Sequence, residues 1–274
     1  MRSHPACLCA ERAREARRWS RQACTVARFT LLESARARLA WTVGATLLGL
    51  SVCALLVEQL AITEGWRLRA VFLAASARLV MVALLCQHVI VSVVREFNDG
   101  AVSFALSLPV TRSAFYSGKL LGFSVLALLT ALLTAGTLAF LVEPERLAFW
   151  CALLAAELSL MVGVALFCAM GTQHALLATL LCAGFYVLAR STAVLESLVA
   201  QRLEFDDTTF THAVSGLVHV LAYVLPDLSR FARTEWLADV RAGGAHVAAA
   251  AIRTAVYLVL TACAGIHDLE RRNL

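Results

Sequence analysis

The chain has 274 residues, of which 60% are hydrophobic and 16% are charged, and its mean hydropathy is +0.76. A soluble domain of this length cannot bury so much apolar surface, so the composition predicts an all-α polytopic membrane protein with room for about six spans of about 20 residues. The formal net charge is +5, with nine arginines ahead of the first apolar run, which favours a topology signal and argues against nucleic-acid binding.

Residues 1–38 are predicted to form a basic cytoplasmic segment that ends in an interfacial helix. Within residues 25–38, Val26, Phe29 and Leu32 fall near one face of a helix, and the arginines fall elsewhere. A helix with that pattern lies in the plane of the membrane interface. The alternative is a basic flank that only precedes the first span. A signal peptide is not expected, because the basic stretch is too long for one.

Six apolar runs predict six transmembrane helices in one domain from residue 39 to 266. Six spans place both termini on one side of the membrane, and the N-terminal arginines place that side in the cytoplasm. Residues 267–274 are then a cytoplasmic tail. A turn is predicted at 143–146 from its proline and charges, and a tight connection at 171–174. The runs are residues 39–57, 70–94, 120–142, 147–170, 175–189, which can extend toward 200, and 245–266.

The segment 190–244 is predicted to be external. It holds seven acidic residues against five arginines, the reverse of the N-terminal charge balance. Residues 214–225 are apolar but too few to cross a bilayer. Pro226 follows and stops the run. We therefore expect a re-entrant or interfacial helix that closes the outer face.

The polar segment 95–119 separates the second and third runs on the predicted cytoplasmic side. Its apolar residues recur at helical spacing from 96 to 108, which predicts a helix. Pro109 ends that helix, because the residue before a proline is biased away from the helical region. Thr111 or Ser113 can cap a second helix that runs into the third span. Two helices joined by a sharp break form a rigid element that a moving partner can push.

Several features stand in order along this segment: Glu96, Gly100, the sequence Leu-Ser-Leu-Pro-Val-Thr-Arg at 106–112, and Gly118-Lys119. Together they resemble the cytoplasmic coupling loop of ABC-transporter permeases of the type 2 exporter family. Residues 101–104, Ala-Val-Ser-Phe, depart from the family's commoner Thr/acidic/Leu character. The helix before the first span is similar to the family's N-terminal elbow helix, and Leu225-Pro226 resembles its outer Leu-Pro motif.

This resemblance implies the permease subunit of an ATP-driven exporter in the plasma (inner) membrane, with a cytoplasmic coupling helix. The implied partners are two cytoplasmic ATPase subunits that carry ATP and Mg, a second permease copy and the lipid bilayer. The chain itself is expected to bind no cofactor or metal and to catalyse no reaction. The residues implied to couple to the ATPase are Glu96, Gly100, Phe104, Leu108, Pro109 and Arg112.

The expectation of a separate ATPase chain has support from the residues. Gly118-Lys119 is not a nucleotide-binding loop, because Ser113 stands where an earlier glycine is required and Leu120 where Ser or Thr is required. A narrower similarity, to permeases of multicopper-enzyme maturation, stays a family association. The sequence shows no Met-rich or Cys/His cluster that would support copper.

Charged residues inside a span are costly and usually face a bundle interior or a wet cavity. Arg78, Glu157 and Arg253 lie roughly mid-span. Glu157 can pair with either arginine. One interpretation is a translocation path that contacts an anionic substrate, and the other is a salt bridge that holds helices together. His88, near the inner end of the second run, is expected to be a hydrogen-bonded interfacial histidine.

Two other classes of protein compete with a transporter subunit. A lipid-modifying membrane enzyme needs clustered acidic or histidine residues, and Asp206-Asp207 is the single adjacent carboxylate pair. A channel or assembly subunit would lack an ATPase. The nine cysteines mostly lie in apolar runs and predict no disulfide framework. Cys7 and Cys9 are an incidental pair or a metal or redox site. Substrate, transport direction, and homodimer against heterodimer stay open.

Overall fold

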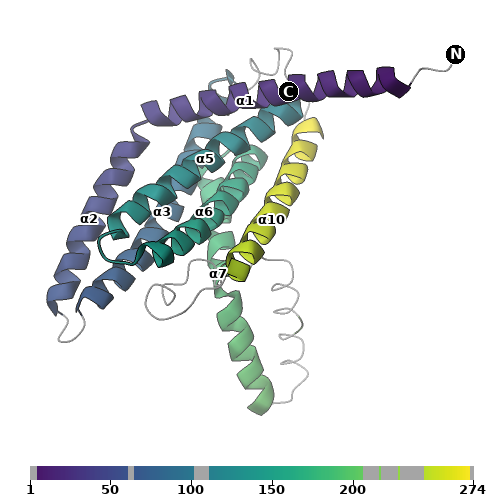
Figure 1. Ribbon diagram of the computed structural model, residues 1–274. Coiled ribbons are helices and arrows are strands. Elements are labelled where there is room, and N and C mark those ends of the chain that lie inside the picture. The colour runs from purple at the N-terminus through teal and green to yellow at the C-terminus, as the bar shows by residue number, and fades with distance from the viewer. Residues whose placement is uncertain are drawn as a thin grey trace.

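The computed structural model describes residues 5–60, 65–101, 111–205, 216, 228 and 244–271 (Figure 1). Seven long helices make up the fold of these residues. All except the first are long and apolar enough to cross a membrane, which confirms an all-α polytopic membrane protein with six spans. The helices are α1 (Pro5–Arg36), α2 (Leu39–Leu60), α3 (Gly65–Asn98), α5 (Arg112–Leu138), α6 (Pro144–Thr172), α7 (Ala175–Phe205) and α10 (Gly244–Arg271).

Helix α6 is the centre of the bundle. In its most apolar stretch 67% of the residues are buried, against 17% in α2 and 11% in α10. It packs against α3, α5, α7 and α10. A central helix contacts protein on all sides, so its sequence is one almost continuous apolar run with little amphipathic pattern.

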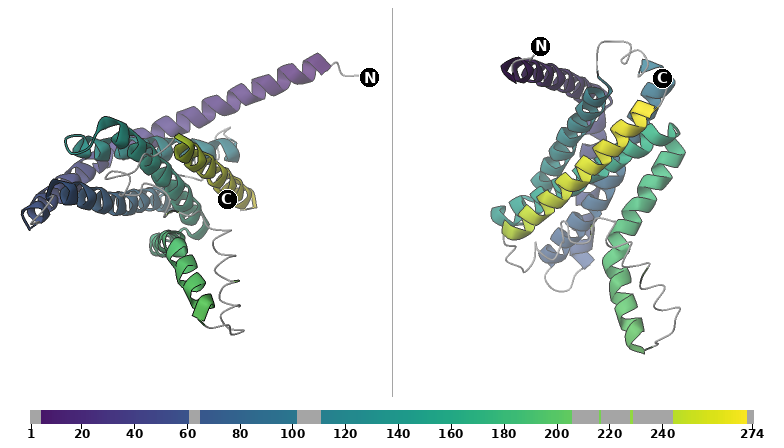
Figure 2. Two further views of the ribbon diagram at one scale, coloured as in Figure 1. Left: turned by 60° about the horizontal axis from the view of Figure 1, so that its bottom comes forward. Right: turned by 90° about the vertical axis from the view of Figure 1, so that its right-hand side faces the viewer.

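Helix α1 lies across one end of the bundle and packs mainly against α5 (Figures 1 and 2). We call this end the α1 face. The C-terminal ends of α3 and α10 and the N-terminal end of α5 also lie there. The predicted helix over 25–38 is present to Arg36, but it begins twenty residues earlier, at Pro5. Phe29 and Leu32 are 71% and 56% exposed, as expected of a helix whose apolar side faces a membrane interface.

The predicted helix over 96–108 is wrong at its start. Glu96 lies in the last turn of α3, which ends at Asn98. Gly100 follows with φ of +70°, and its N–H donates to the carbonyl of Phe97 at 3.2 Å. This left-handed glycine ends α3 and satisfies one of its free carbonyls. Glu96 and the residues after Gly100 are therefore not part of one continuous helix. The predicted helix starting after Thr111 is confirmed, because α5 runs from Arg112 to Leu138.

Other boundaries differ because helices continue past their apolar runs. Residues 143–146 do not form a turn, since Pro144 is the first residue of α6, where a proline costs no hydrogen bond. Helix α7 continues to Phe205, so the predicted external segment 190–244 begins as helix, and α10 carries the predicted tail to Arg271. The tight connection at 171–174 is confirmed, with Gln173 left-handed at φ 56°. Gly216 is helical, but the rest of the short outer helix predicted at 214–225 and Pro226 lie outside the described residues.

Candidate functional site

The first turns of α5 are joined to three other helices at the α1 face. Thr111 is the N-cap, and its hydroxyl accepts a hydrogen bond from the Ala114 N–H at 3.3 Å. This bond satisfies one of the free donors at the helix start. Trp19 of α1 donates its indole N–H to the Ser113 hydroxyl at 3.3 Å. The start of α5 is therefore fixed both by its own cap and by α1.

Arg112 and Tyr116 attach α5 to the C-terminal end of α10. The Arg112 guanidinium donates to the carbonyl of Leu269 at 2.6 Å and to that of Glu270 at 3.4 Å. A cation there satisfies free carbonyls and complements the negative end of the helix dipole. Tyr116 donates its hydroxyl to the carbonyl of Thr261 at 3.2 Å. Its ring covers Gly265 so closely that any side chain at Gly265 would overlap it.

Lys119 attaches α5 to α3. Its ammonium donates to the Glu96 carboxylate in an ion pair whose side chains are 5% and 17% exposed. The same ammonium lies 5.9 Å from the ring centroid of Phe115 and 5.8 Å from that of Phe123. Aromatic rings at this distance attract a cation through their negative faces. Breaking a buried pair costs far more than losing a surface one, because the remaining charge stays without a partner.

Two glycines bring α5 against α1. A Cβ on Gly118 would lie 2.7 Å from the Ala23 carbonyl oxygen, and one on Gly122 would lie 3.0 Å from the Ala27 carbonyl oxygen. The opposing α1 surface is also made of small residues, with Thr30 2% exposed. Glycines four residues apart allow such close helix contact. The Gly-x-x-x-Gly pattern at 118–122 is present in the sequence, but the contact with α1 was not predicted from it.

Further polar contacts join α1 to α3. The His88 imidazole lies 3.1 Å from the Ser34 hydroxyl of α1, which confirms the expected hydrogen-bonded histidine. One turn along α3, Ser92 donates to the Glu33 carboxylate at 3.4 Å. The contacts that the start of α5 makes with α1, α3 and α10 together form a region that we call the α5 junction. It is defined by Glu96, Arg112, Ser113, Tyr116, Gly118 and Lys119.

The six residues predicted to couple to an ATPase do not all lie in the α5 junction. Glu96 and Arg112 are engaged within the α5 junction, and Gly100 forms the turn after α3. Phe104, Leu108 and Pro109 lie outside the described residues. The segment 99–111 starts beside the Glu96–Lys119 pair and ends at Arg112. Its first end is joined to α5 through the Glu96–Lys119 pair, and its second end is joined to α10 and α1 through Arg112 and Ser113.

A second polar site lies inside the bundle. Glu157 of α6 is fully buried, and its carboxylate oxygens lie 3.7 Å from Arg78 Nε of α3 and 3.9 Å from an Arg190 terminal nitrogen of α7. Tyr186 donates its hydroxyl to the same carboxylate at 3.4 Å. Arg253, predicted as a further member, lies on the exposed side of α10. Sequence reasoning missed Arg190 because it assigned the end of α7 to an external loop.

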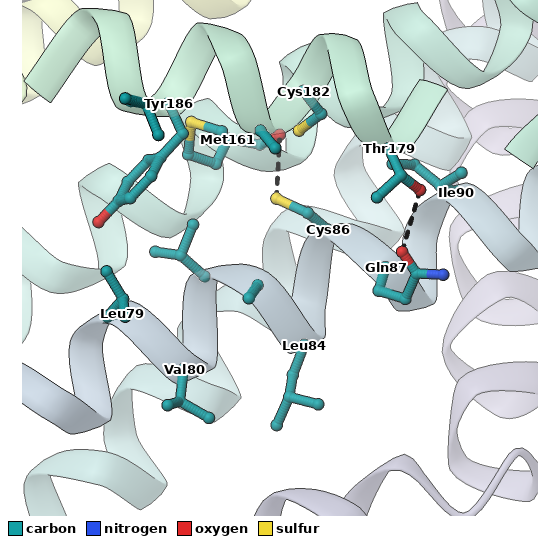
Figure 3. A pocket seen from close by; sticks show the side chains of 14 residues that line it. Leu79, Val80, Leu84, Cys86, Gln87, Ile90, Met161, Thr179, Cys182 and Tyr186 are labelled. Atoms are coloured by element: carbon teal, nitrogen blue, oxygen red, sulfur yellow. Dashed lines mark hydrogen bonds between the residues drawn. The ribbon is translucent and has the colours of Figure 1, made fainter. Parts of the chain in front are cut away.

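A cavity of about 550 Å³ adjoins this charged site between α3, α6 and α7 (Figure 3). Tyr186 lies at one end of it. At the other end Thr179 donates its hydroxyl to the Gln87 side-chain carbonyl at 3.0 Å, and between the two ends the Cys86 thiol donates to the Met161 carbonyl at 3.8 Å. The remaining wall is almost entirely aliphatic, from Leu79, Val80, Val82, Ala83, Leu84, Ile90, Cys182, Ala183 and Val187.

Comparisons with models of known protein families and with curated proteins found no match for this chain.

Proposed function

We propose that this chain is the membrane-spanning permease subunit of an ATP-driven ABC exporter of the type 2 family. Six membrane spans and an α1 helix lying across one end of them support the proposal. The observation that carries it is the α5 junction, where both ends of segment 99–111 are fixed to the bundle through the Glu96–Lys119 pair and Arg112. A connecting segment held in this way is suited to receive force from a partner.

The α5 junction gives the proposal a mechanism. A partner that pulls segment 99–111 acts on α3 and α5 together, because a buried ion pair links them. Arg112 transmits the same displacement to α10, and the glycine contact transmits it to α1. Packed helices move as units rather than deforming, so a small local shift becomes a movement of several spans.

Glu96 and Arg112 are positioning residues in this mechanism. Their charged groups are held by α5 and α10, so contact with the ATPase falls to the exposed residues between them. Asp99, whose side chain is 64% exposed and pairs with Arg95, is one of these in the described part of the chain. ATP and Mg belong to two cytoplasmic ATPase subunits, and a second permease copy completes the transporter in the plasma (inner) membrane, with both termini cytoplasmic.

Purification of the tagged chain from its native membranes in mild detergent tests this proposal. We expect a soluble protein with a nucleotide-binding loop to co-purify in near-stoichiometric amount. The control is a variant in which residues 102–110 are replaced by a Gly/Ser linker of equal length. It should reach the membrane but lose the ATPase. Absence of an ATPase from the wild-type preparation, or its full retention by the linker variant, would contradict the proposal.

A further inference from the structure

We propose that the cavity between α3, α6 and α7 binds an anionic amphiphile with a single aliphatic chain, which enters sideways from the bilayer. This inference deepens the proposed function by naming a substrate class, and it rests on that function for the claim of transport. Three properties of the cavity carry it: its dimensions, the position of its opening and the charge at one end.

The dimensions fit one extended aliphatic chain. The cavity extends along α3 from Leu79 to Ile90, which corresponds to about 16 Å of helix axis. Its volume of about 550 Å³ is within the range of small-molecule sites. Spread over that length, this volume leaves room for one extended aliphatic chain.

The opening faces the place where the bilayer would lie. Leu79 and Val187 line the cavity and are 56% and 65% exposed, and both are within membrane-spanning stretches of α3 and α7. Figure 3 shows Leu79 and Tyr186 at the same end of the cavity. An apolar chain can enter from lipid without crossing water.

The charge at the Tyr186 end favours an anionic head group. Tyr186 lines the cavity and also donates to Glu157, so it connects the cavity to the charged site. Among the described residues, that site holds two arginines and one carboxylate, a formal charge of +1. The Arg190 terminal nitrogen that lies 3.9 Å from Glu157 makes no hydrogen bond within the described part of the chain, and neither does one carboxylate oxygen of Glu157. An unbalanced charge is costly inside a membrane. A phosphate or carboxylate beside Tyr186 would balance it.

Binding measurements on the purified chain in phosphatidylcholine nanodiscs test the inference. The probes are radiolabelled dodecyl phosphate and dodecanol, which share a chain and differ in head-group charge. We expect saturable binding of dodecyl phosphate, about tenfold tighter than that of dodecanol. Equal binding of the two probes, or no saturable binding above empty nanodiscs, would overturn the inference.

Three variants locate the site. Ala183→Phe fills the cavity from its exposed wall and should weaken dodecyl phosphate binding about tenfold or more. Leu180→Phe is the matched control, since Leu180 is 61% exposed on the same helix and does not line the cavity. Arg190→Gln keeps the Arg78–Glu157 pair and should abolish the preference for the anion while dodecanol binding persists. Unchanged binding by Ala183→Phe, or an unchanged preference in Arg190→Gln, would overturn the inference.

Failure of this inference is separable from failure of the proposed function. Loss of amphiphile binding with an ATPase still co-purifying contradicts the site alone. Binding without any ATPase supports the site and contradicts the transporter. If Ala183→Phe instead breaks a dimer and neither probe binds, a second copy covers the cavity and the inference is overturned.

Discussion

Lys119 is the single lysine among 24 lysine and arginine residues. In a chain that otherwise uses arginine, its position indicates that a guanidinium does not fit there. The ammonium is buried between Phe115 and Phe123 and points at Glu96. A compact point charge on a flexible stem suits this narrow space, whereas the planar guanidinium is wider and needs more donors satisfied.

We expect Lys119→Met to destabilise the protein by about 3–5 kcal/mol, because it leaves the Glu96 carboxylate buried without its partner. Lys119→Arg should also destabilise, through overpacking between the two rings. Adding Glu96→Gln to Lys119→Met should recover most of the loss, since both charges are then absent. Thermal unfolding in detergent measures these effects. Additive losses in the double variant would show that the two residues do not act as a pair.

At the scale of helices, the six spans follow from hydropathy alone, because a run of about 20 consecutive apolar residues is typical of a membrane-spanning helix. The helix ends cannot be predicted from hydropathy, because a helix can continue through polar residues beyond the lipid, where the apolar run has already stopped. Helix α5 begins eight residues before its apolar run at 120, and its start was predicted from the capping residue Thr111 rather than from hydropathy. Gly100 is a typical helix-ending residue, but the apolar spacing from 96 to 108 pointed to an unbroken helix.

The candidate site was predictable only in part. The motifs of segment 95–119 mark it in the sequence, but the partners of its charged residues depend on the tertiary structure. Glu96 and Lys119 are 23 residues apart, and Arg112 and Leu269 are 157 apart. No periodicity in one sequence relates such positions. Arg190 was missed because it directly follows the apolar run 175–189 and was assigned to the external segment, whereas the Glu157–Arg78 pairing was one of the two predicted pairings.

The contact between α1 and α5 depends on Gly118, and Gly136 of the same helix provides a matched control. A Cβ on Gly118 would meet α1 backbone, whereas one on Gly136 has no heavy atom within 4 Å. We expect Gly118→Val to cost about 1–3 kcal/mol and to loosen α1. Gly136→Val should change little.

Limited trypsin digestion of the detergent-purified variants measures this loosening. Arg28 is exposed on α1 and becomes more readily cleaved when α1 detaches from α5. Cleavage after Arg28 should therefore accelerate in Gly118→Val and stay at the wild-type rate in Gly136→Val. Equal rates in both variants would contradict the assigned role of the glycine contact.

At the scale of the whole molecule, the two ends of the bundle differ. The α1 face gathers the α5 junction, the C-terminal end of α10 and the contacts of α1 with α3 (Figure 1). The opposite end carries the Arg69–Glu58 pair between α2 and α3 at 3.1 Å. At the α1 face, bonds of Arg112, Ser113 and Lys119 join α5 to α10, α1 and α3. A docking partner placed there can therefore act on several helices at once.

Site-specific photo-cross-linking in native membranes tests the central claim most directly. A photoreactive residue replaces Asp99 at the α1 face or, as a control, Phe140, which is 96% exposed after α5 at the opposite end. The account predicts that the Asp99 position cross-links to a soluble protein with a nucleotide-binding loop and that the Phe140 position does not. Absence of such a protein at Asp99, or its capture at Phe140, would contradict the account.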